Sequence, residues 1–150
     1  MSTLLIVHHT PSPATRELLE AVLAGTRDPE ITGVDVVVRP ALSATVTDML
    51  DADAYIFGTP ANFGYMSGAL KHFFDTVYYP VLDHVANRPY GLWVHGNSDI
   101  VGAVSSADRI TSGLGLVRAA DVLEVTGGVD GAVRQMAYEL GGTLAAIVMK

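Results

Sequence analysis

Apolar and polar positions change their period repeatedly along this chain. Five short apolar runs, rich in β-branched residues, are bounded by Gly, Pro, Asn or Ser: Thr3–His8, Val34–Arg39, Ala54–Phe57, Tyr90–His95 and a stretch within Leu116–Val125. Between these runs, apolar residues recur at helical spacing over 14–26, 45–51, 66–81, 101–114 and 133–144. Apolar runs of this length are typical of strands buried on both faces of a sheet, and the segments between them predict amphipathic helices.

This alternation predicts an α/β fold, with a parallel sheet covered by helices on both faces and joined by right-handed crossovers. The chain has 150 residues without an internal repeat or a low-complexity linker, so we expect one domain over 1–150. Ligands of such sheets lie outside the carboxyl ends of the strands. The loops at 9–15, 58–66 and 96–102 are therefore the places to look for a site.

Composition narrows the classes of function. A net charge of −7 and a pI near 5.0 argue against nucleic acid or an anionic membrane as the main partner. The chain has no cysteine, which excludes disulfides, thiolate catalysis and cysteine metal sites. The apolar run LLIV is too short for a membrane span or a signal peptide, so a cytoplasmic protein is expected.

The first loop, HHTPSPAT, joins a buried strand to the start of a helix. Free backbone N–H groups and the helix dipole favour an anion there, and the hydroxyls of Thr10, Ser12 and Thr15 suit a phosphate. An ordinary helix cap, with Ser12 as N-cap and Pro13 as first helical residue, explains the same residues, and the two interpretations are compatible. His8 and His9 point to opposite faces of a strand, so we predict no metal site.

The second loop reads GTPANFGYMSG and follows a strand predicted to end at Gly58. Thr59-Pro60 forces an extended turn, and Asn62 and Gly64 permit unusual backbone angles. Phe63 adds a flat aromatic face. Such a loop can present backbone polar groups to the edge of a planar ring, with aromatic side chains nearby.

The stretch GTPANFGYMSGALKHFFD resembles the flavin-ring loop of the flavodoxin-like quinone and flavin reductases. The resemblance is to the NAD(P)H:quinone oxidoreductases related to the tryptophan-repressor-binding protein, and to the NADPH-dependent FMN reductase group. Their loop has the pattern G-T-P-x-x-F-G-x-M, followed by a helix with an aromatic pair and an Asp. The matching residues are Gly58, Thr59, Pro60, Phe63, Gly64, Met66, Phe73 and Asp75.

The resemblance implies a three-layer αβα, doubly wound, five-stranded parallel sheet with the flavodoxin-like order 2-1-3-4-5. It also implies bound FMN and hydride transfer from NAD(P)H, followed by electron transfer to a quinone or another flavin. The first loop resembles the flavodoxin phosphate loop more loosely. Pro13 stands where that family usually has Gly, which removes one N–H donor, and Ala14 stands where it often has Asn.

The third loop, HGNSDIVG, borders the other side of the flavin ring in such proteins, although Ser98 or Asp99 would equally serve as a helix cap. Phe63, Tyr65 and His95 are candidates for lining the open ring face. The cofactor carries the redox chemistry, so no residue is predicted as catalytic acid or base, and no metal is predicted. The residues expected to bind FMN are Thr10, Ser12, Pro13, Ala14, Thr15, Thr59, Pro60, Ala61, Asn62, Phe63, Gly64, His95, Gly96, Asn97 and Ser98.

Two alternatives share the fold. The first is a flavodoxin-type electron carrier, which an acidic surface suits because it docks basic redox partners. The second is a binding module that has lost FMN, which Pro13 keeps open. Tyr78 and Tyr79, after the Phe73-Phe74 pair, predict a partly exposed apolar patch, and the family implies a homodimer or homotetramer.

Overall fold

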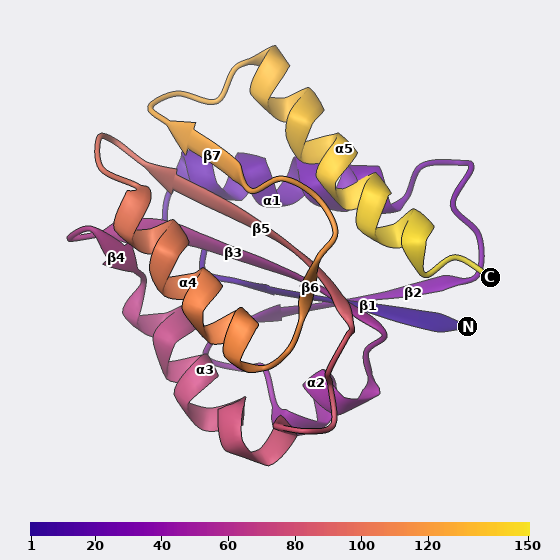
Figure 1. Ribbon diagram of the computed structural model, residues 1–150. Coiled ribbons are helices and arrows are strands. Elements are labelled where there is room, and N and C mark those ends of the chain that lie inside the picture. Colours follow the sequence, from indigo (N-terminus) through magenta and orange to yellow (C-terminus); the bar gives the residue numbers. More distant parts are fainter.

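A twisted parallel sheet forms the centre of the computed structural model, which describes residues 1–150 (Figure 1). Its main strands run in the order β2-β1-β3-β5-β6, with β7 also paired to β5. Every pairing is parallel except that of β3 with β4. The strands are β1 (Ser2–His8), β2 (Val34–Pro40), β3 (Ala54–Asn62), β4 (Tyr65–Met66), β5 (Pro89–Gly96), β6 (Val117–Arg118) and β7 (Leu123–Thr126).

Helices cover both faces of this sheet. The helices are α1 (Pro13–Thr26), α2 (Val46–Asp51), α3 (Gly68–Val81), α4 (Val101–Gly113) and α5 (Gly131–Ile147). In Figure 1, α1 and α5 lie together on one face, and α3 and α4 lie on the other. No helix is both long and apolar enough to span a membrane.

Each face has its own apolar core. Leu5, Phe57 and Leu92 point toward α3 and α4, where Phe57 packs edge-on against Phe74 with ring centroids 5.1 Å apart. Leu4, Ile6, Ile56 and Trp93 point toward α1 and α5. This division is the one expected for doubly wound strands, whose alternate residues meet helices on opposite sides.

Gly58 lies where the second core leaves no room for a side chain. A Cβ at Gly58 would lie 2.0 Å from the fully buried ring of Trp93 on the neighbouring strand β5. The glycine that begins the second loop of the sequence therefore also allows the largest side chain of the core to pack across the sheet.

The predicted three-layer α/β fold and strand order are confirmed. Counting β6 and β7 as one interrupted fifth strand, the sheet has the order 2-1-3-4-5. The sequence analysis places one strand within Leu116–Val125, and the interruption at 119–122 was not predicted.

The third strand does not end near Gly58, as the sequence suggested, but continues to Asn62. Thr59 and Pro60 remain paired with Val94 and His95 of β5. Because β1 pairs with β3 only as far as Gly58, the strand has an open side beyond that point, and a proline is tolerated there.

The chain then reverses in a two-residue hairpin between Asn62 and Tyr65, which pair with each other. The left-handed residues are Phe63, with φ 52°, and Gly64, with φ 71°. Of the two residues that the sequence marks as permitting unusual angles, Gly64 has one, whereas Asn62 belongs to β3. Two consecutive positive φ angles are what a tight hairpin turn requires.

Candidate functional site

A cavity of about 470 Å³ lies at the carboxyl ends of β1, β3 and β5. This volume is in the usual range of small-molecule and cofactor sites. The cavity is lined by Pro11, Ser12, Pro13, Ala14, Pro60, Ala61, Asn62, His95, Gly96, Asn97 and Gly127. The three loops selected from the sequence therefore meet around one hollow, joined by the loop that follows β7.

The first loop is organised by a capping box at the start of α1. Ser12 Oγ accepts a hydrogen bond from the Thr15 backbone N–H at 3.2 Å, and Thr15 Oγ1 accepts one from the Ser12 N–H at 3.1 Å. Thr15 is fully buried and does not line the cavity. Thr10 lies outside the lining too, with its Oγ1 3.1 Å from His8 Nδ1. The three hydroxyls therefore do not point into one cradle.

Few hydrogen-bond donors of the first loop remain free. Pro11 and Pro13 have no N–H, and the Ser12 N–H is used within the cap. The Ala14 N–H has no acceptor within the chain, and it points out of the first turn of a 14-residue helix. An anion here would therefore meet the Ala14 N–H, the Ser12 hydroxyl and the positive end of the α1 dipole.

Some residues of the second loop line the cavity, and others are buried below it. Pro60, Ala61 and Asn62 line the cavity. Thr59 instead is fully buried below it, where Thr59 Oγ1 accepts a hydrogen bond from the Ser67 N–H at 3.0 Å. This contact links the end of β3 to the N-cap of α3, and Thr59 does not line the cavity.

Phe63 and Gly64 form the tip of the hairpin, beyond the cavity lining. The Phe63 side chain is fully exposed, at 109% of the reference area, although its backbone is in the left-handed region. A bulky residue in this conformation costs free energy, and such strain is retained mostly at functional positions.

The third loop supplies the opposite wall. A carbonyl can only accept, so His95 Nε2 donates to the Gly127 carbonyl oxygen at 2.7 Å, and this contact joins the loops after β5 and β7. A Cβ at Gly96 would lie 3.2 Å from Ala61 Cβ, so the two walls are closely packed at the floor. Asn97 lines the cavity with an exposed side chain, whereas Ser98 does not line it.

The start of α4 differs from both caps that the sequence suggested. Its N-cap is Ile100, which has no side-chain cap bond. Asp99 Oδ1 accepts from the Val101 N–H at 3.2 Å, and Ser98 takes no part.

Two residues that line the cavity, Pro11 and Gly127, were not predicted. Gly127 follows the fifth strand, whose carboxyl end lies at the same edge of the sheet as those of β1, β3 and β5. The Gly127-Gly128 pair is the feature of the sequence that could have indicated this loop.

Comparison with known proteins bears on this site. The model of the NADPH-dependent FMN reductase family matches residues 14–132. The chain belongs to this family. The match begins after Pro13, so the proline-rich part of the first loop lies outside it. A flavodoxin of Aquifex aeolicus is 35% identical over 77 residues, which are 51% of this chain and 40% of that protein.

A second curated relative of this FMN reductase family member is an NAD(P)H dehydrogenase (quinone) of Geobacter sulfurreducens. It is 31% identical over an alignment of 115 residues, and the match covers 62% of this chain and 51% of the relative. The chain thus spans about half the length of the curated relatives it matches.

Solved structures agree in fold. An archaeal flavodoxin superposes with a TM-score of 0.83 at 18% identity, covering 97% of this chain and 98% of its own. A flavodoxin, WrbA-like protein from Agrobacterium tumefaciens gives 0.79 at 18% identity, covering 99% of this chain and 98% of its own. The predicted resemblance to flavodoxin-like FMN proteins is confirmed, and the family agrees with the predicted class of NAD(P)H-dependent FMN flavoprotein.

The residues of the cavity fit FMN, the cofactor this family implies. Asn62 and Asn97, whose amides can donate and accept hydrogen bonds, both line the cavity. A Cβ at Gly96 would lie 2.7 Å from Ile100 Cγ2, so glycine allows the third loop to pack this closely. The anion end, by contrast, has few donors and no lysine or arginine. The cavity therefore fits the polar planar ring of FMN better than the phosphate of FMN.

Proposed function

We propose that this protein binds FMN in the cavity of the three loops and passes electrons from NAD(P)H through FMN to a quinone or flavin acceptor. The observation that carries the proposal is the convergence of the loops after β1, β3 and β5 on one cavity of cofactor size. Membership of the NADPH-dependent FMN reductase family supports the same chemistry.

The lining residues divide the task of holding FMN. The Ser12 hydroxyl and the Ala14 N–H would take the phosphate, and Pro13 and Pro11 would shape the loop around it. Pro60, Ala61 and Asn62 would meet the ring on one side, and Gly96 and Asn97 on the other. His95 fixes the loop that closes the cavity through its bond to Gly127. When bound, FMN supplies the redox chemistry, accepting two electrons from the nicotinamide and giving them to the acceptor.

The remaining predicted residues act around the lining. Thr10, Thr15 and Thr59 hold the loops in place through their hydrogen bonds. Phe63, at the exposed tip beside Gly64, would cover or flank the ring face where nicotinamide and acceptor alternate. Ser98 is exposed and does not line the cavity.

The proposal is tested by adding FMN to the purified protein and recording its visible spectrum and fluorescence. NADPH or NADH oxidation with a quinone acceptor follows. Bound flavin with turnover supports the proposal. Bound flavin that is not reduced by either nucleotide refutes the enzymatic part, and a spectrum of free flavin at micromolar FMN refutes the whole.

A flavodoxin-type electron carrier is the second candidate. The net charge of −7 favours it, because acidic carriers dock basic redox partners, and the Aquifex aeolicus relative carries the name flavodoxin. A carrier would bind FMN and exchange electrons with a reduced partner without oxidising NAD(P)H. A module without FMN, the third candidate, would leave the spectrum of added flavin unchanged.

A further inference from the structure

A groove runs between α3 and α4, on the other side of the hairpin from the FMN cavity. It consists of two adjoining cavities of about 410 Å³ and 210 Å³, which share Lys71 and Ile110. The larger one begins at Gly64 and Tyr65 of the hairpin, and the smaller one ends at Tyr78 and Tyr79.

The two ends of the groove differ in chemistry. Near the hairpin, Lys71 of α3 and Arg109 and Ser105 of α4 line the same cavity. At the far end the lining is aromatic, and Tyr79 is 79% exposed, with its ring 5.2 Å from that of Tyr78. Because Lys71 and Tyr78 are seven residues apart on one helix, the cationic and aromatic ends lie about 10 Å apart.

Arg109 is the one cation in the groove without a carboxylate partner. The ion pairs of the chain use Arg39, Lys71, Arg118 and Arg134, and the Arg88 guanidinium donates to backbone carbonyl groups. Lys71 is paired with Asp75, which also faces the groove, so Lys71, Asp75 and Arg109 together leave one positive charge there. A free cation in a groove of a strongly acidic chain favours an anionic ligand.

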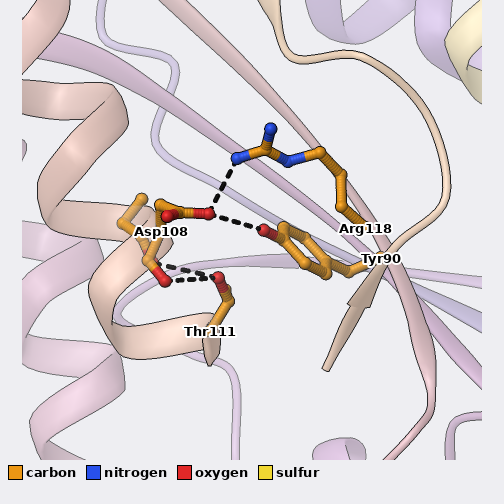
Figure 2. A network of polar contacts seen from close by, with 5 residues as sticks. Tyr90, Asp108, Thr111 and Arg118 are labelled. Carbon is orange, nitrogen blue, oxygen red and sulfur yellow. Dashed lines mark hydrogen bonds and ion pairs between the residues drawn. The ribbon is translucent and has the colours of Figure 1, made fainter. Parts of the chain in front are cut away.

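Asp108 of α4 contacts residues of the sheet, whereas Arg109 lines the groove. Figure 2 shows Asp108, the preceding residue, between Tyr90 of β5 and Arg118 of β6. Asp108 Oδ1 accepts from Arg118 Nη2 at 2.7 Å and from the Tyr90 hydroxyl at 3.4 Å. Adjacent residues of a helix point in different directions. Asp108 is held by Arg118 and does not pair with Arg109.

We propose that this groove binds the adenosine-phosphate half of NAD(P)H, an assignment that rests on the proposed function. Arg109, with Lys71 and Ser105, binds the phosphate groups, and the exposed Tyr79 ring stacks on the adenine. Stacking of a base on an aromatic ring and pairing of arginine with phosphate are the usual means of holding these groups. The Ser105 hydroxyl can turn to the ligand because its present bond, to the Gly102 carbonyl, is long at 3.3 Å.

The groove is close enough to the FMN cavity for one dinucleotide to occupy both. Asn62 lines the FMN cavity, and Gly64, two residues later, lines the groove. Two residues of chain span at most roughly 7 Å. The nicotinamide would thus reach the FMN cavity across the hairpin tip, beside Phe63, while the phosphates remain between α3 and α4.

The direct test is calorimetric binding of adenosine 2′,5′-bisphosphate to the FMN-loaded protein, at low and at high salt. We expect binding that weakens with salt, and that Arg109→Gln weakens roughly tenfold through loss of a charge-assisted phosphate contact. Arg27→Gln is the matched control. Arg27 is exposed at the C-terminal end of α1, forms no ion pair and does not line the groove. Absence of binding to the wild-type protein, or equal weakening by both variants, overturns the proposal.

Kinetics with both nucleotides give the second test. Arg109→Gln and Tyr79→Ala should each raise the KM for NADPH several-fold, with kcat and FMN affinity unchanged. An effect on NADPH alone assigns Arg109 to the 2′-phosphate, and an equal effect on NADH assigns it to the pyrophosphate. If Tyr79→Ala changes only the oligomeric state of the protein, Tyr79 belongs to a subunit interface and the proposal is wrong.

The two proposals fail separately. Protein that does not bind FMN refutes the proposed function, and bisphosphate binding can still be measured on it. Protein that binds FMN and oxidises NAD(P)H, with nucleotide affinity unaffected by Arg109→Gln, refutes only the assignment of the groove.

Discussion

Gly102, in the first turn of α4, packs directly on the Gly64 carbonyl at the hairpin tip. A Cβ at Gly102 would lie 1.8 Å from that oxygen, and one at Gly64 would lie 3.7 Å from Asp99 Oδ2. The third loop and the hairpin are therefore in backbone contact. This contact sets the distance between two walls of the proposed FMN cavity.

Gly102→Ala should force these two segments apart. We expect a loss of about 1–3 kcal/mol in the free energy of unfolding, as for overpacked positions, together with weaker FMN binding. Chemical denaturation and FMN titration measure the two effects. Gly68→Ala is the matched control, because Gly68 is in the first turn of α3 and a Cβ there would meet no atom within 4 Å. Equal stability of both variants would contradict the packing described.

Phe63→Asn should separate stability from function at the hairpin tip. Asparagine tolerates the left-handed φ of 52° far better than phenylalanine, and Asn-Gly is the preferred pair for this turn. We expect the variant to be more stable by about 1 kcal/mol and to have a lower kcat/KM with NAD(P)H or quinone. A variant that is more stable and fully active would show that Phe63 has no part in the reaction.

Pro13→Gly should increase the affinity for FMN. The change restores an N–H at the start of α1, where the Ala14 N–H is otherwise the free backbone donor of the first turn. One added hydrogen bond to a charged phosphate is worth about 1.5–3 kcal/mol, or tenfold and more in Kd. Loss of a proline at a favourable position should lower stability by about 0.4–1 kcal/mol. Unchanged or weaker FMN binding would place the phosphate elsewhere.

His8 should make stability depend on pH. Burial lowers the pKa of His8 below its ordinary value of 6.5, and the charge of His9 lowers it further. Between the lowered pKa and 6.5 the unfolded chain binds more protons than the folded one, so the free energy of unfolding falls as pH drops through this window.

Urea unfolding at about pH 7.5 and about pH 5.5 measures this loss. His8→Gln should reduce it, whereas His84→Gln, at an exposed position, should leave it unchanged. Equal pH dependence in all three proteins would contradict the assignment to His8.

The sequence predicts the layers of the fold and the convergence of the three loops well, because both follow from periodicity. Apolar runs such as Ala54–Phe57 identify strands, and the carboxyl ends of parallel strands must meet at one edge. The helix cap at Ser12-Pro13 was equally readable, since its residue types have few other uses.

The roles of individual loop residues could not be predicted, because they depend on contacts between residues that are separated in the sequence. Nothing near Thr59 indicates that its hydroxyl accepts from Ser67 N–H rather than facing a ligand. The left-handed Phe63 was missed because asparagine and glycine usually take such angles, and only the pairing of Asn62 with Tyr65 fixes the turn. The contact of His95 with Gly127 likewise joins loops 32 residues apart.

The central claim is that FMN occupies the cavity of the three loops, and fluorescence titration of FMN against a pair of matched variants tests it most directly. Ala14 lines the cavity at the start of α1, and Ala24 is exposed near the end of the same helix. We predict that the wild-type protein and Ala24→Phe quench added FMN to the same degree, whereas Ala14→Phe, which fills the cavity, does not. FMN that stays free with the wild-type protein, or binds equally to Ala14→Phe, would contradict the account.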